Sequence, residues 1–180
     1  DVYKRQGRGR TAMKRMELTK LGETLASNPD LAQDKQMLRR LRKHAKDAEI
    51  ADRVLAIVAK MPGSGGGDVL YDVWFRTRKT SPVAQLAEEL LFSKDVRAKA
   101  SPALSVLLDL RIEKDCDKVE QIVARAVEHG DMRCLIPLGK LVPKVGCGER
   151  KRSDCYPCLR NRAGVRDAIT AVRRRPMPMF

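Results

Sequence analysis

The sequence is poor in aromatic side chains, in histidine and in long apolar runs. Of its 180 residues, 7 are aromatic and 2 are histidine. No apolar run approaches the roughly 18 residues that a membrane-spanning helix needs, and no targeting segment is visible. The chain begins at Asp1 rather than Met, so we expect a fragment, or the C-terminal part, of a larger multidomain protein.

The motifs that carry phosphate binding and nucleophilic catalysis are also missing. The glycine-rich stretch 63–67 lacks the preceding strand and the following Lys-Ser or Lys-Thr of a phosphate-binding loop. Neither His44 nor His129 stands in a recognisable motif with a nucleophile and a carboxylate. We therefore predict a non-enzymatic chain with no catalytic residue, no cofactor and no small-molecule substrate.

Basic side chains are in excess, and they gather at the two ends of the chain. The net charge is +14, from 37 Lys and Arg against 23 Asp and Glu. Residues 1–46 carry +8, residues 47–139 carry −2 and residues 140–180 carry +8. Such clusters either bind an anionic partner or form solvated helix faces and chain ends. The candidate binding residues are Arg39, Arg40, Arg42, Lys43, Lys46, Arg150, Lys151, Arg152, Arg173, Arg174 and Arg175.

Hydrophobic spacing predicts an all-α fold of short, stacked antiparallel helices. Apolar residues recur every three or four positions, and two-residue alternation is missing. Ser81-Pro82 and Ser101-Pro102 are typical of helix N-termini. Asp115 and Asp131 can cap further helices, and Gly130 is expected to end one of them in the left-handed conformation.

Composition divides the chain into six predicted segments. The glycine-rich stretch is taken as a flexible linker, because glycine adds backbone freedom without a stabilising side chain. The segments are a disordered basic tail (1–10), an N-terminal helical hairpin (11–62), the linker (63–67), a helical-repeat core (68–145), a cysteine-containing loop (146–162) and a C-terminal helix and tail (163–180).

Two short stretches carry a resemblance to a known family. Asp95-Val96-Arg97-Ala98-Lys99-Ala100, followed by Ala103-Leu104, resembles the pattern of HEAT-type repeats, and Gly130-Asp131-Met132-Arg133 to Leu138 resembles a looser second copy. The resemblance covers roughly residues 68–145. It implies an armadillo-like α-superhelix in which Asp95 and Arg97 have structural roles, and a scaffold that binds a protein partner.

Three of the five cysteines lie close together, at Cys147, Cys155 and Cys158. Three interpretations compete. They hold a structural zinc ion, with Cys134 or His129 as fourth ligand; Cys147 forms a disulfide with Cys155 or Cys158; or the thiols are unpaired.

The other two cysteines, Cys116 and Cys134, are interpreted as unpaired and packed as small apolar residues. A redox role for the C-x-x-C pair is disfavoured, because the βαβ context of that motif is missing.

These observations favour a helical-repeat interaction module that binds a protein partner. The alternatives are a basic helical domain that binds nucleic acid and a chain that attaches to an anionic membrane surface. The cysteines bear on localisation. We expect an extracytoplasmic protein if the three clustered cysteines are oxidised, and a cytoplasmic one otherwise.

Overall fold

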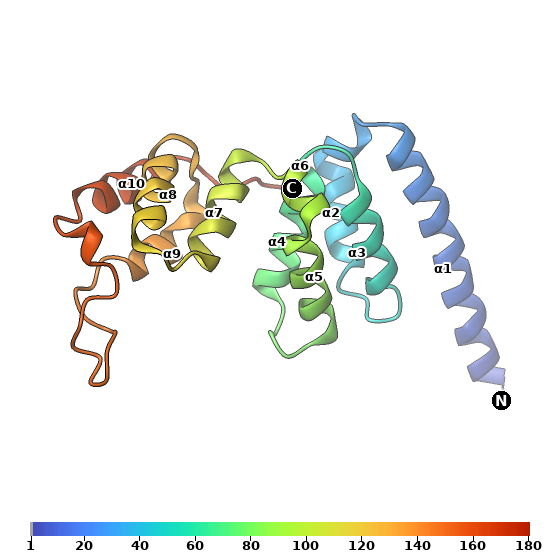
Figure 1. Cartoon of the computed structure of the whole chain (residues 1–180). Helices are drawn as coiled ribbons and strands as arrows, with labels where there is room; N and C mark the ends of the chain where they lie inside the picture. Colours follow the sequence, from blue (N-terminus) through green and yellow to red (C-terminus); the bar gives the residue numbers. More distant parts are fainter. Residues whose placement is uncertain (1) are drawn as a thin grey trace. The chain divides into compact units, whose positions relative to one another are not determined.

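The computed structural model describes residues 2–180, with side chains from Lys14 onward. Ten α-helices and three 3-10 helices form the regular structure of this range, which confirms the all-α prediction (Figure 1). The helices are α1 (Val2–Ser27), η1 (Leu31–Gln33), α2 (Lys35–His44), α3 (Ala51–Lys60), α4 (Gly65–Arg76), α5 (Pro82–Phe92), α6 (Lys94–Lys99), α7 (Pro102–Ile112), α8 (Cys116–His129), η2 (Met132–Cys134), α9 (Leu135–Lys140), η3 (Pro157–Leu159) and α10 (Ala163–Arg173).

The chain forms two compact units. Unit 1 comprises residues 1–100 together with Phe180, and unit 2 comprises residues 101–179. Within unit 1, α1 begins at Val2 and so includes most of the segment that composition predicts as a tail. No proline precedes Pro29, so the sequence offers nothing strong to stop this helix earlier.

The glycine-rich stretch differs most from its prediction as a linker. Gly65, Gly66 and Gly67 are buried in the first turn of α4. A Cβ atom on Gly66 would lie 2.2 Å from the carbonyl oxygen of Val58, and one on Gly65 would lie 2.8 Å from that of Ala32. These glycines therefore allow α4 to approach neighbouring backbone closely, which accounts for their composition without a flexible linker.

The core of unit 1 lies among α2, α3, α4 and α5. Helix α4 packs against each of the other three, and its Val69 and Leu70 are fully buried. Tyr71 and Trp74 of the same helix are each 5% exposed, whereas Phe75 is 43% exposed. Apolar burial of this kind is the main stabilising contribution to a helical unit.

The core of unit 2 lies among α7, α8, α9 and α10. Helix α8 packs against α7 on one side and α10 on another. Leu104, Leu107 and Leu108 of α7 are fully buried, as is Leu138 of α9. The packing leaves the N-terminal ends of α8 and α10 beside the segment that carries the clustered cysteines.

Most of the predicted helix caps are present. The hydroxyl groups of Ser81 and Ser101 accept hydrogen bonds from backbone N–H groups three residues on, and the carboxylate of Asp115 does the same for Lys118. Gly130 differs from its prediction, because its backbone is extended at φ −64° rather than left-handed. A Cβ atom there would meet Val172 at 2.8 Å, so close packing against α10 explains this glycine.

Candidate interaction surfaces

A disulfide between Cys147 and Cys155 closes an exposed loop, residues 146–155, which we call the cystine loop. The Cα atoms of the two cysteines are 5.1 Å apart. Inside the disulfide, Cys147 and Ser153 exchange two backbone hydrogen bonds of 3.0 Å, and the N–H of Lys151 donates to the carbonyl of Gly148. The loop therefore has a hairpin geometry, and it extends away from the helices of unit 2 (Figure 1).

A second disulfide joins Cys116, at the start of α8, to Cys158 in η3. The prediction that Cys147 pairs with one of its two neighbours is confirmed for Cys155. The interpretation of Cys116 as an unpaired thiol is wrong, because the fold brings it within disulfide distance of a cysteine 42 positions along the chain. These four sulfur atoms form two disulfides, so none of them is a thiolate of the kind that a zinc site requires.

Arg162 fixes the base of the cystine loop to the rest of unit 2. Its guanidinium is buried and donates to both carboxylate oxygens of Asp154, at 2.7 and 2.5 Å. It also donates to the carbonyl oxygens of Tyr156 and Leu159. The pKa of Asp154 lies below its ordinary value, because the carboxylate accepts a hydrogen bond from the N–H of Tyr156 and is paired with Arg162.

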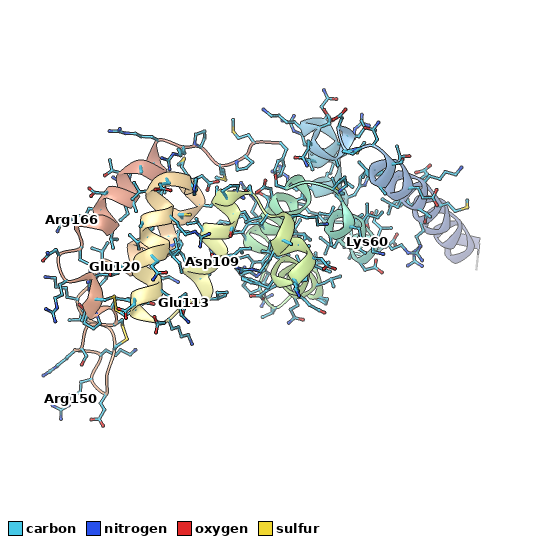
Figure 2. The ribbon with its side chains drawn as sticks, turned by 45° about the horizontal axis from the view of Figure 1, so that its top comes forward. Lys60, Asp109, Glu113, Glu120, Arg150 and Arg166 are labelled. Carbon is cyan, nitrogen blue, oxygen red and sulfur yellow. A yellow bond between two sulfur atoms is a disulfide. The ribbon has the colours of Figure 1, made fainter. Side chains whose placement is uncertain are left out.

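A groove lies between α8 and the segment that leads from η3 into α10. Its volume is about 500 Å³. Val123, Leu159 and Val165 supply buried apolar surface, while Glu120 and Arg160 are exposed members of its lining. Figure 2 labels Glu120 on α8. We call this feature the α8–α10 groove, and its combination of an apolar floor with charged edges resembles the anatomy of protein interfaces.

The predicted basic residues of unit 1 lie on α2 and the turn after it. Arg39, Arg40, Lys43 and Lys46 are exposed, and we call these four the α2 basic face. Arg42 is half-buried instead, with a guanidinium nitrogen 3.7 Å from a carboxylate oxygen of Asp72. The opposite side of α2 buries Leu38 and Leu41 in the core. An apolar face therefore holds the helix while its other face displays cations.

The predicted basic residues near the C-terminus have two different environments. Arg173 and Arg174 are exposed at the end of α10. Arg175 donates to the carbonyl oxygens of Val127 at 2.7 Å and Gly130 at 3.1 Å, so its side chain bonds the last turn of α8. The remaining predicted cluster, Arg150 to Arg152, is exposed in the cystine loop.

Cys134 is the free cysteine of unit 2, and it is buried. Burial raises the pKa of its thiol to about 11, so the thiol is protonated at neutral pH. It lies beside a buried ion pair in which Arg133 donates to Asp131 at 2.7 Å. Among the described residues, no group of three or more His, Cys, Asp or Glu side chains is arranged to hold a metal ion.

Sequence reasoning missed Cys116, Asp154 and Arg162 as parts of this region. The pairing of Cys116 depends on tertiary contacts over 42 positions. The one available signal is that the cluster holds three cysteines, so a pair within it leaves one for a distant partner. Asp154 and Arg162 are eight positions apart in an irregular segment, where no periodicity signals a contact.

Comparison with protein-family models, with curated proteins and with solved structures finds no match for this chain. Within the part of the chain that the structure describes, no helix is both long and apolar enough to cross a bilayer. The two cysteine pairs at disulfide distance suggest an oxidising compartment.

Proposed function

We propose that this chain is a non-enzymatic helical interaction module that binds a protein partner at the α8–α10 groove. The observation that carries the proposal is the composition of this groove. Buried Val123, Leu159 and Val165 offer an apolar floor to a partner's side chains, and exposed Glu120 and Arg160 offer charged edges. Protein interfaces combine an apolar centre with a polar rim in this way.

The resemblance to HEAT-type repeats is consistent with this role. Short capped helices that pack on their neighbours form a rigid scaffold, and in helical-repeat proteins the helices present extended binding surfaces. Asp131 and Arg133, which belong to the looser copy of the pattern, form a buried ion pair, as expected for structural residues.

Two alanine-to-glutamate variants test the proposal. Ala124 is an exposed residue of the groove on α8, and Ala26 is an exposed residue of α1 in unit 1. A124E places a charged side chain in the groove, while A26E makes the same chemical change elsewhere. Wild-type protein immobilised under non-reducing conditions is used to recover binding proteins from an extract of the source, and each recovered protein is then titrated against all three chains.

We expect A124E to weaken the binding of the true partner at least tenfold and A26E to change it less than twofold. If every recovered protein binds A124E as tightly as the wild type, the groove is not the binding site and the proposal fails.

Nucleic-acid binding is the second candidate function, and the α2 basic face favours it. No acidic residue lies between Lys35 and Lys46, and the four cations of the α2 basic face are exposed to solvent. Binding of a random-sequence duplex should then weaken with salt, with a slope of roughly 0.9 for each phosphate neutralised. We expect R39Q/K43Q to lower this slope by about two. At about 20 mM salt, charges are only weakly screened. Absence of duplex binding under this condition would exclude the function.

A further inference from the structure

The cystine loop holds three adjacent cations at the surface of unit 2. Arg150, Lys151 and Arg152 are exposed, and Figure 2 shows Arg150 at the end of the loop farthest from the helices. One carboxylate, that of Glu149, accompanies them in this part of the loop. The other acidic residue of the loop, Asp154, is bound by the buried Arg162. The end of the loop therefore carries a net positive charge.

Apolar packing does not hold this arrangement. Every residue from Val142 to Ser153 is exposed, so burial contributes little to ordering the segment. Backbone hydrogen bonds of the hairpin and the disulfide between Cys147 and Cys155 hold it instead. Lys151 also adopts a left-handed conformation, with φ 53°, which is uncommon for a side chain of this kind.

The charge pattern of the loop fits carboxylates. Each of two arginines, Arg150 and Arg152, can bind a carboxylate through two parallel N–H groups, while Lys151 adds a point charge between them. The end of the loop carries no aromatic or large apolar side chain that would enter a lipid bilayer.

From these observations we infer that the cystine loop binds an acidic segment of the protein partner, and that this binding depends on the Cys147–Cys155 disulfide. The inference rests on the proposed function and adds the chemistry of the partner and its redox dependence. The loop and the groove meet at Arg162, which lines the groove and binds Asp154 at the base of the loop. A partner segment that leaves the groove at Arg162 and continues along the loop would meet the cations at its end.

The test uses a fluorescein-labelled peptide of ten glutamates as the probe, with fluorescence anisotropy at low ionic strength. Three residues are reversed in each of two matched variants, R150E/K151E/R152E in the loop and R39E/R40E/K43E on the α2 basic face. Both variants lower the net charge of the chain equally, so any difference between them reflects position rather than total charge. A third variant, C147S/C155S, keeps all the cations and removes the disulfide.

We expect the loop reversal to weaken peptide binding at least tenfold and the α2 reversal to weaken it less than threefold. The C147S/C155S variant should weaken it about fivefold, because the cations are no longer held together. Equal losses in the two reversal variants would mean that net charge alone attracts the peptide, and would overturn the inference. An unchanged affinity in C147S/C155S would overturn the redox dependence.

Two further measurements distinguish an acidic peptide from other polyanions, and distinguish this inference from the proposed function. Phosphatidylserine vesicles or duplex DNA that bind more tightly than the peptide, with the same loss on loop reversal, would assign the loop to those ligands and overturn the inference. The peptide assay does not involve the groove, so A124E should leave it unchanged. If the loop variants bind the peptide as tightly as the wild type while A124E still weakens binding of the partner, the inference fails and the proposed function stands.

Discussion

The two units of this chain keep their helices together by different means. Unit 1 has no cysteine in residues 1–100, and it relies on apolar burial and on glycines that let α4 approach its neighbours. Unit 2 contains all five cysteines, two disulfides and two ion pairs with buried guanidinium groups, Asp131–Arg133 and Asp154–Arg162. A reducing environment should therefore break covalent bonds in unit 2 and leave unit 1 unchanged.

The same contrast applies to the two cationic surfaces. The cations of the α2 basic face stand on a helix whose other side is buried, so packing fixes them. Those of the cystine loop stand on a segment with no buried residue, so a covalent bond fixes them. We therefore expect the first surface to be constitutive and the second to depend on oxidation.

The largest expected effect is the loss of the disulfide that ties η3 to α8. By the chain-entropy relation, closing a loop over 42 positions stabilises unit 2 by about 4 kcal/mol, and C116S/C158S should lose that amount. Hydrogen exchange in α8 should accelerate accordingly. Trp74, which is the one tryptophan of the chain and lies in unit 1, should keep its fluorescence midpoint in a urea titration. A fall in that midpoint equal to the loss in unit 2 would break the comparison.

An added methyl group should be costly at Gly66 of unit 1 and tolerated at Gly139 of unit 2. G66A places a Cβ atom 2.2 Å from a backbone oxygen of α3, which should destabilise unit 1 by about 3 kcal/mol. G139A in α9 is the matched control, because no atom lies within 4 Å of its Cβ position. It should raise the stability of unit 2 by about 0.5 kcal/mol. Urea midpoints from Trp74 fluorescence and from circular dichroism measure the two effects, and a neutral G66A would contradict the packing account of α4.

Removal of the second disulfide should have a smaller and more local effect. The C147S/C155S variant opens a loop of 8 positions, which by the same relation costs about 2.5 kcal/mol at most. Because the loop has no buried residue, we expect faster hydrogen exchange in residues 146–155 with little change in α8. Equal acceleration in α8 would show that the cystine loop is part of the folded core of unit 2.

The smallest expected effect is a pH dependence that arises from Asp154. Its folded pKa lies below the ordinary value of 3.8, so its carboxylate stabilises the folded state in full above that pH. The stabilisation is lost as the pH falls through the folded pKa, because the unfolded chain binds the proton first. The melting temperature of unit 2 should therefore be higher than that of D154N at pH 6, and the two should converge below pH 3.8. A constant difference across this range would exclude the ion pair as its cause.

Local signals in the sequence were sufficient for the helices but not for their close contacts. The caps at Ser81, Ser101 and Asp115 follow from side-chain chemistry within three residues, so sequence reasoning could place them. The role of Gly66 could not be predicted. A glycine that allows close contact with distant backbone looks the same in the sequence as a glycine in a flexible linker.

The candidate site divides in the same way. The pair Cys147–Cys155 lies within one short segment and was among the predicted pairings. Cys116, Arg162 and the α8–α10 groove depend on how α8, η3 and α10 pack, which no local pattern encodes. The sequence therefore indicates the cystine loop, whereas the second disulfide, the Arg162 contacts and the groove become apparent only in the tertiary structure.

Peptide mapping by mass spectrometry tests the central claim, the disulfide-held loop, most directly. The full chain, isolated from its source, is unfolded and alkylated before any reduction and is then cut with trypsin. The account predicts that residues 115–118, 145–150 and 153–160 travel as one assembly joined by two disulfides, with alkylated Cys134 alone in 134–140. In C116S/C158S, 145–150 should stay joined to 153–160 through Cys147 and Cys155. Alkylation of all five cysteines before reduction would contradict the account.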